Sequence, residues 1–64
     1  MWTVIYMATD EETALRVENA IKSEGFLVRT REITKSKKHG CCIEILVPES
    51  EAQEAYNVIL EKNL

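Results

Sequence analysis

The sequence has few of the residues that break or cross-link a chain. Its 64 residues include two glycines, one proline and two cysteines. So little glycine and proline excludes a collagen-like or low-complexity chain, and 45% hydrophobic residues argue against disorder. The cysteines are adjacent, at Cys41 and Cys42, and so they form no disulfide framework. Reduced thiols in a cytoplasm are the natural interpretation.

The sequence also lacks a long apolar run and an excess of positive charge. The apolar run Trp2–Ala8 is too short to span a membrane, and acidic residues follow it in place of a signal-peptide cleavage site. The net charge is −3, whereas a nucleic-acid-binding protein would carry a basic surface. We therefore expect a cytoplasmic protein with neither a membrane nor a nucleic acid as its partner.

Catalytic groups are scarce as well. The chain has one histidine, and neither a Ser-His-Asp or Cys-His arrangement nor a phosphate-binding glycine-rich loop stands out. The acidic run Asp10, Glu11 and Glu12 is explained by the dipole of a helix that it begins. We expect no enzyme, no cofactor and no metal site. The length fits one domain, residues 1–64, which buries only about 60% of the surface of its unfolded chain.

Three stretches predict strands: residues 2–8, 26–33 and 41–47. They are rich in β-branched, aromatic or aliphatic side chains and are bounded by turn or cap residues. The polar stretch Lys35–Gly40 predicts the hairpin connection between the last two strands. Pro48 ends the third strand, because proline has no N–H to donate.

The first helix is predicted over residues 10–24. At its start, Thr9 and Glu12 have the spacing of a capping box, and Asp10 is a competing N-cap. At its end, Gly25 stands where a left-handed C-terminal cap is needed. Its apolar stripe consists of Ala14, Val17 and Ile21.

The second helix is predicted over residues 50–62. Ser50 and Gln53 repeat the capping-box spacing at its start. Apolar residues then recur at helical spacing, and they predict the side that packs on the sheet. These residues are Ala52, Ala55, Tyr56, Ile59 and Leu60.

The order of elements is strand, helix, strand, strand, helix. A right-handed crossover makes strands one and two parallel, and strand three fits between them, antiparallel to both. The predicted fold is α+β: a ferredoxin-like βαββα domain with a three-stranded antiparallel sheet in the order 1-3-2 and two helices on one face. We expect Ile43, Ile45 and Val47 to face the helices. Their expected partners are Val17, Ile21, Ile59 and Leu60.

Strand one is then an edge of the sheet, hydrophobic on both alternations and without a charge or proline. Pairing with a second copy would cover this edge and add the burial that a small chain needs. We expect a homodimer or larger homo-oligomer, with Trp2, Val4 and Tyr6 as interface residues. A different protein partner on this edge and cover by Asn63–Leu64 are the competing explanations.

Several short motifs follow one another in the order of a known family. They are Tyr6 with Ala8, Glu12, Glu24-Gly25-Phe26, Val47-Pro48, and Ala52 with Ala55. In this order they resemble small bacterial signal-transducing proteins that are related in fold to the PII nitrogen regulators. The resemblance covers most of the chain. It implies a ferredoxin-like, self-associating domain that binds a ligand or partner without catalysing a reaction.

The chain also departs from the PII pattern. PII proteins have a long effector loop between strands two and three, where this chain has only Lys35–Gly40. Their nucleotide site uses residues of a fourth strand, which is lacking in this order of elements. The resemblance therefore carries over neither ATP nor 2-oxoglutarate binding.

Two side-chain clusters are candidate sites. Lys35, Lys37, Lys38 and His39 form a local basic patch in an acidic protein, which suits a small anionic ligand or an acidic partner. A solvated turn that raises solubility is the alternative interpretation. Arg29 and Arg31, two apart on one strand face, either pair with helix carboxylates or extend this patch.

The second cluster is the pair Cys41–Cys42. Successive strand side chains point to opposite faces, so buried structural roles are favoured over a shared metal. Two functions follow from these residues. The first is a non-enzymatic regulatory or binding module, as the PII-like resemblance implies. The alternative is a thiol-based redox or metal-handling module that uses Cys41 and Cys42.

Overall fold

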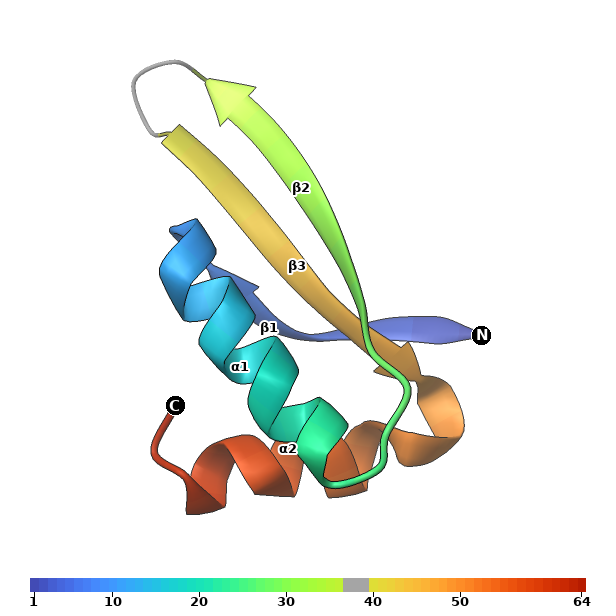
Figure 1. Ribbon diagram of the computed structural model, residues 1–64. Coiled ribbons are helices and arrows are strands. Elements are labelled where there is room, and N and C mark those ends of the chain that lie inside the picture. The colour runs from blue at the N-terminus through green and yellow to red at the C-terminus, as the bar shows by residue number, and fades with distance from the viewer. Residues whose placement is uncertain (37–39) are drawn as a thin grey trace.

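The structure is a computed structural model that describes residues 1–36 and 40–64, and the side chains of residues 34–36, 40 and 41 lie outside this description. The chain forms three strands and two α-helices in the order β-α-β-β-α (Figure 1). Their bounds are β1 Trp2–Ala8, α1 Glu11–Ser23, β2 Arg29–Ser36, β3 Gly40–Pro48, a 3₁₀ turn Glu49–Glu51, and α2 Ala52–Glu61.

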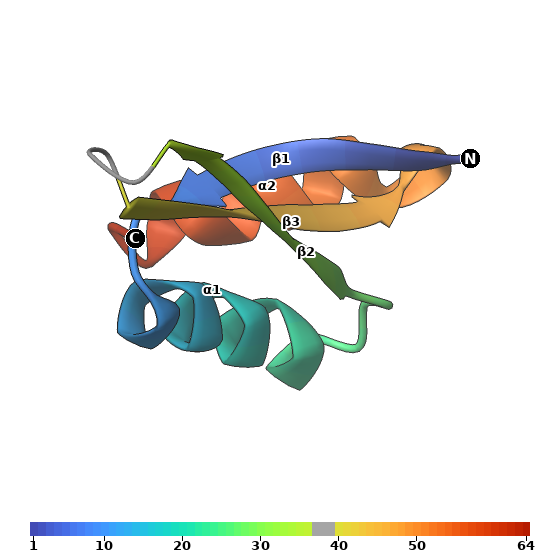
Figure 2. The ribbon, with the colours of Figure 1, turned by 90° about the horizontal axis from the view of Figure 1, so that it is seen from above.

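The sheet has the order β1-β3-β2, and β3 pairs antiparallel with both neighbours. Seen from above, α1 lies to one side of the sheet and α2 lies beneath β1 and β3 (Figure 2). This arrangement confirms the predicted α+β, ferredoxin-like fold. No helix among the described residues is long and apolar enough to cross a bilayer.

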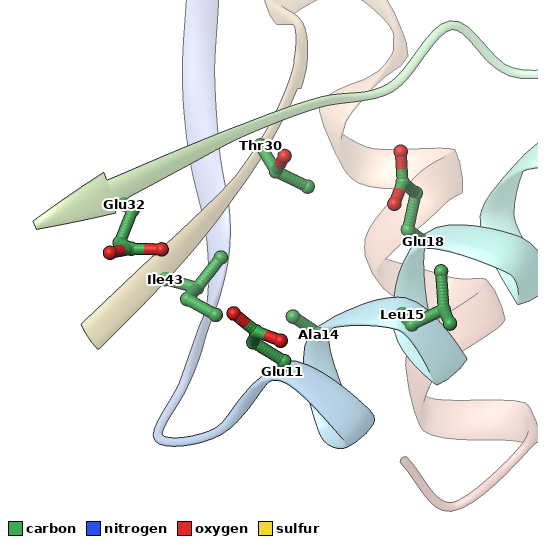
Figure 3. A pocket seen from close by; sticks show the side chains of 7 residues that line it. All are labelled: Glu11, Ala14, Leu15, Glu18, Thr30, Glu32 and Ile43. Atoms are coloured by element: carbon green, nitrogen blue, oxygen red, sulfur yellow. The ribbon is translucent and has the colours of Figure 1, made fainter. Parts of the chain in front are cut away.

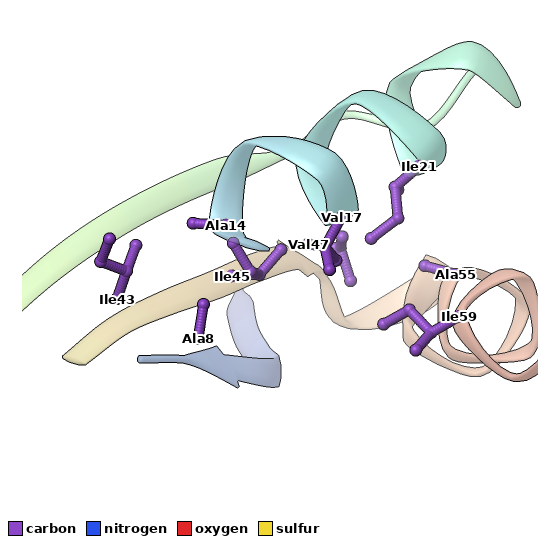
Figure 4. Packing of buried hydrophobic residues seen from close by; sticks show 9 residues of the cluster. All are labelled: Ala8, Ala14, Val17, Ile21, Ile43, Ile45, Val47, Ala55 and Ile59. Carbon is purple, nitrogen blue, oxygen red and sulfur yellow. The ribbon is translucent and has the colours of Figure 1, made fainter. Parts of the chain in front are cut away.

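The core lies between the two helices and one face of the sheet (Figure 4). Its largest fully buried side chains are Ile21, Ile45, Val17 and Val47. Alternate residues of β3 therefore face the helices, as the period of a strand requires and as the sequence predicts. Burying one such side chain contributes about 1.5–3 kcal/mol, so this strand supplies much of the stabilising burial.

Strand β1 contains an irregularity that changes its facing pattern. Val4 pairs with Leu46 but Tyr6 pairs with Ile45, so Ile5 is an extra residue in β1. The bulge turns Tyr6 toward the helices, where it is partly buried against the core. Met7, which pairs with Glu44, points to the opposite face.

The second strand begins and ends later than the predicted range 26–33. Phe26 and Val28 pack against the core, but neither belongs to the ladder. The register pairs Arg29 with Leu46, so continuing it backwards would place Leu27 opposite Pro48. Proline has no N–H for the ladder, and the pairing therefore starts at Arg29. At its other end, β2 continues to Ser36, through part of the predicted connection.

Helix α1 starts at the competing N-cap candidate, so the capping box of Thr9 and Glu12 is wrong, and it ends at the predicted glycine. Asp10 is the N-cap: its carboxylate accepts a hydrogen bond of 2.7 Å from the backbone N–H of Thr13. Gly25 follows the helix with φ of +92°, a conformation that disfavours residues with a Cβ. Its N–H donates to the carbonyl of Lys22 at 2.9 Å, which satisfies one of the free carbonyls of the last turn.

Helix α2 departs from its prediction in two respects. Ser50 and Gln53 form no capping box; the 3₁₀ turn leads into α2 without a side-chain cap. Tyr56 and Leu60, which were expected in the core, are exposed, and Val58 is buried in their place. The orientation of the helix on the rest of the protein is the reason. The side with Ala55, Val58 and Ile59 packs against the core, and the side with Tyr56 and Leu60 faces no described element.

Candidate binding surfaces

The face of the sheet opposite the helices, which we call the open face, is organised in rows across the three strands. One row contains Val4, Leu46 and Arg29, and the next contains Met7, Glu44 and Arg31. Trp2 and Cys42 share this face with the two rows, since each stands two residues from a row member on its strand.

Arg29 of the first row contacts Trp2 across the central strand. The guanidinium carbon of Arg29 lies 4.4 Å from the centroid of the Trp2 ring. Leu46 lies on β3 between these two strands and is only 6% exposed, although it is not part of the helix-side core. The Arg29 stem and the Trp2 ring thus cover an apolar residue on a face that carries no helix.

The second row carries an ion pair and an exposed apolar side chain. Arg31 Nε donates to Glu44 Oε1 at 2.8 Å, and Nη2 of the same guanidinium donates to the same oxygen. Arg31 therefore pairs with a strand carboxylate, which corrects the expectation of a helix partner. Met7 at the other end of the row is 48% exposed, so the open face is apolar toward β1 and cationic toward β2.

The predicted interface residues do not share one face. Trp2 and Val4 lie on the open face, whereas Tyr6 lies on the helix side opposite Ile45. Met7 replaces Tyr6 on the open face because of the bulge at Ile5. Strict alternation along a strand cannot reveal an extra residue, and so the sequence does not show which of these two side chains lies on which face. The role of Tyr6 in an interface stays a prediction.

The thiol of Cys42 is half-buried on the open face, at the position that pairs with Ile33. Cys41 precedes it in β3, and its side chain lies outside the described residues. Within residues 1–36 and 40–64, no group of three or more His, Cys, Asp or Glu side chains is placed to hold a metal. The redox interpretation of the pair stays a prediction.

The predicted basic patch falls mainly outside the described part of the chain. Lys35 is in β2, but its side chain is not described, and Lys37, Lys38 and His39 lie outside the described residues altogether. An anion site at this turn therefore stays a prediction.

A groove of about 300 Å³ lies on the helix side, between α1 and β2 (Figure 3). Its apolar lining is formed by Ala14, Leu15 and Ile43. Its acidic residues are Glu11, Glu18 and Glu32, of which Glu18 forms a 3.0 Å ion pair with Lys22. The groove suits a cationic group with an apolar stem, but part of its acidic charge is already compensated within the helix.

No family model, curated protein or solved structure matches this chain. The geometry itself therefore has to indicate the function. Of the two described surfaces, the open face has the exposed apolar side chains Val4 and Met7 and a cationic group held in place by stacking. These are features of surfaces that bind proteins, in which exposed Trp, Met and Arg are enriched.

Proposed function

We propose that the protein is a non-enzymatic regulatory module that binds a protein partner through the open face of its sheet. This is the kind of role that the resemblance to the PII-like signal-transducing proteins implies. The observation that carries the proposal is an apolar sheet face, with Trp2, Val4 and Met7 on it, that no described helix covers. Exposed apolar patches on small proteins mark interaction sites.

The chemistry of the partner follows from the two halves of the face. Val4 and Met7 on β1 are exposed and suit an apolar contact. Arg29 on β2 forms no ion pair with a described residue, because its guanidinium stacks on Trp2. Its N–H groups remain available to a carboxylate, and stacking reduces the entropy that the side chain loses on binding. The partner is thus a protein surface that combines an apolar patch with an acidic side chain.

Affinity capture from the cells that express the protein tests this proposal. Met7→Lys adds a charge to the apolar half of the face, and Arg29→Glu reverses the charge of the cationic half. Asn19→Lys is the matched control, because Asn19 is an exposed residue of α1, on the helix side of the sheet. Partners identified by mass spectrometry are then bound to each purified variant in a titration.

A partner that binds the wild type and Asn19→Lys equally, and that binds both open-face variants at least about tenfold more weakly, supports the proposal. Equal binding by all four proteins contradicts it, since the open face would then make no contact.

A further inference from the structure

A second apolar surface lies along the outer side of β1 and α2. Tyr56 and Leu60 are one helical turn apart on α2 and both are exposed, Leu60 by 57%. Gln53 and Asn57 extend this flank, so all four of its side chains are uncharged. Glu54 and Glu61 of α2 border the flank beside Asn57, on the side away from Tyr56 and Leu60. We call Gln53, Tyr56, Asn57 and Leu60 the α2 flank.

The α2 flank lies on the β1 side of the molecule. The ammonium of Lys62, the C-cap of α2, lies 3.9 Å from the carboxylate of Glu24 at the end of α1, and Val58 is one helical turn before Lys62. The side of α2 that contains Val58 therefore faces α1. The α2 flank lies on the other side of the buried residues Ala55, Val58 and Ile59. β1 is an edge strand and lies above α2, on the side of the molecule away from α1 (Figure 2). The α2 flank and the unpaired edge of β1 therefore lie on the same side of the molecule.

Strand β1 presents unpaired backbone groups on the same side. The carbonyl of Met1 accepts from the N–H of Glu49 at 2.7 Å, so Met1 turns its polar groups toward the end of β3. By alternation Thr3 does the same, and Trp2 and Val4 turn their N–H and carbonyl groups outward. No described strand pairs with this outer edge, and Trp2–Ala8 holds neither a charge nor a proline to protect it.

We infer that this surface binds a second copy of the chain, with β1 pairing antiparallel with β1 of the partner and the two α2 flanks packing together. A two-fold axis perpendicular to the sheet, between the two β1 strands, produces one six-stranded sheet and puts the helices of both copies in one layer. The α2 flank then meets its own copy, which an uncharged apolar surface permits and an acidic one would oppose. The pairing is isologous, so each copy covers the other's exposed edge.

Both parts of the surface are needed for a stable dimer. Pairing along the seven residues of β1 is only about 23 Å long and covers a narrow strip. A standard interface buries about 800 Å² on each partner, and the α2 flank supplies apolar area beside the strip. The open face remains accessible in this dimer and becomes twice as wide. The inference therefore goes beyond the proposed function and does not depend on what binds the open face.

Sedimentation equilibrium of the full chain over a wide concentration range tests the inference. Leu60→Lys puts a charge on the α2 flank at an exposed helical site. Leu15→Lys is its matched control: Leu15 is 56% exposed, it lies on α1, and it is outside the proposed interface. We expect the wild type and Leu15→Lys to dimerise alike, and Leu60→Lys to dimerise at least about tenfold more weakly.

Val4→Pro tests the strand separately, because it removes an outward N–H and leaves the hydrogen bonds between β1 and β3 in place. We expect this variant to be monomeric. Should it fail to fold, amide exchange of the wild type decides: the amides of Trp2 and Val4 should exchange more slowly as the protein concentration rises.

A wild type that stays monomeric at every concentration overturns the inference. So does equal weakening by Leu15→Lys and Leu60→Lys, or exchange at Trp2 and Val4 that is independent of concentration. These results do not affect the proposed function, because a monomer can bind a partner through the open face. Conversely, a dimer for which no open-face partner is found would contradict only the proposed function.

Discussion

The guanidinium of Arg29 and the ring of Trp2 come from the two edge strands and meet above the central one, 4.4 Å apart. The contact joins β1 to β2, which do not pair with each other, and it covers Leu46 between them. It thus stabilises the sheet on the side that has no helices. It also holds the guanidinium of Arg29 in a fixed position.

Loss of this contact should be measurable as a coupling free energy. We expect Trp2→Ala and Arg29→Ala each to lower the free energy of unfolding, with a coupling of about 0.5–1 kcal/mol in the double-mutant cycle. The reason is that each truncation alone already removes the stacking. Urea denaturation at one fixed protein concentration measures all four proteins. Strictly additive effects would show that the two side chains do not interact in solution.

The central strand should be very sensitive on one face and tolerant on the other. Ile45→Ala should lower the free energy of unfolding by about 2–5 kcal/mol, because it leaves a cavity between the sheet and both helices. Cys42→Ser, on the open face, should cost less than about 1 kcal/mol. Chemical denaturation followed by circular dichroism compares them. Equal costs, or an Ile45→Ala protein of full stability, would mean that the faces of β3 are reversed.

The N-cap of α1 should make stability depend on pH. The hydrogen bond from the Thr13 N–H holds the pKa of the Asp10 carboxyl below its usual range. The folded pKa is then below the unfolded one of 3.8, so the stabilisation is fully present above the unfolded pKa and is lost as the pH falls through the folded pKa. Asp10→Asn keeps an oxygen acceptor but does not titrate.

We therefore expect the difference in melting temperature between wild type and Asp10→Asn to shrink as the pH is lowered from neutral into the acid range. Thermal denaturation at several pH values measures this difference. A difference that is constant across the range would show that the carboxylate does not cap the helix in solution.

Gly25 should resist substitution for a reason of backbone geometry alone. Its φ is +92°, and a Cβ added there would meet no atom within 4 Å. Gly25→Ala should therefore destabilise by about 1–2 kcal/mol through the left-handed conformation and without a clash. Gly25→Asn should cost less, because asparagine adopts positive φ more readily. Thermal unfolding of both variants separates these effects, and an alanine variant as stable as wild type would contradict the assignment.

Much of the fold could be read from local signals. The caps Asp10 and Gly25, the polar connection after β2 and the alternation along β3 each depend on neighbours in the sequence, and the structure confirms the strand order built on them. The candidate site was only partly predictable. The sequence predicts Trp2, Val4 and Tyr6 as interface residues of an edge strand, and this stays a prediction. The stack of Arg29 on Trp2 requires the order and register of three strands, which no local pattern contains.

The sequence by itself determined the order of strands and helices and which residues of β3 enter the core, because the periods of 2.0 and 3.6 residues act through adjacent turns and pleats. The tertiary structure decided which side chains remain outside. Ile5 bulges out of the ladder and exchanges the faces of Tyr6 and Met7. Helix α2 lies under an edge strand, so one flank of its apolar stripe has no neighbour, and Tyr56 and Leu60 stay exposed. A periodic pattern fixes the direction of a side chain relative to its own helix; only the packing of the other elements determines whether anything lies there.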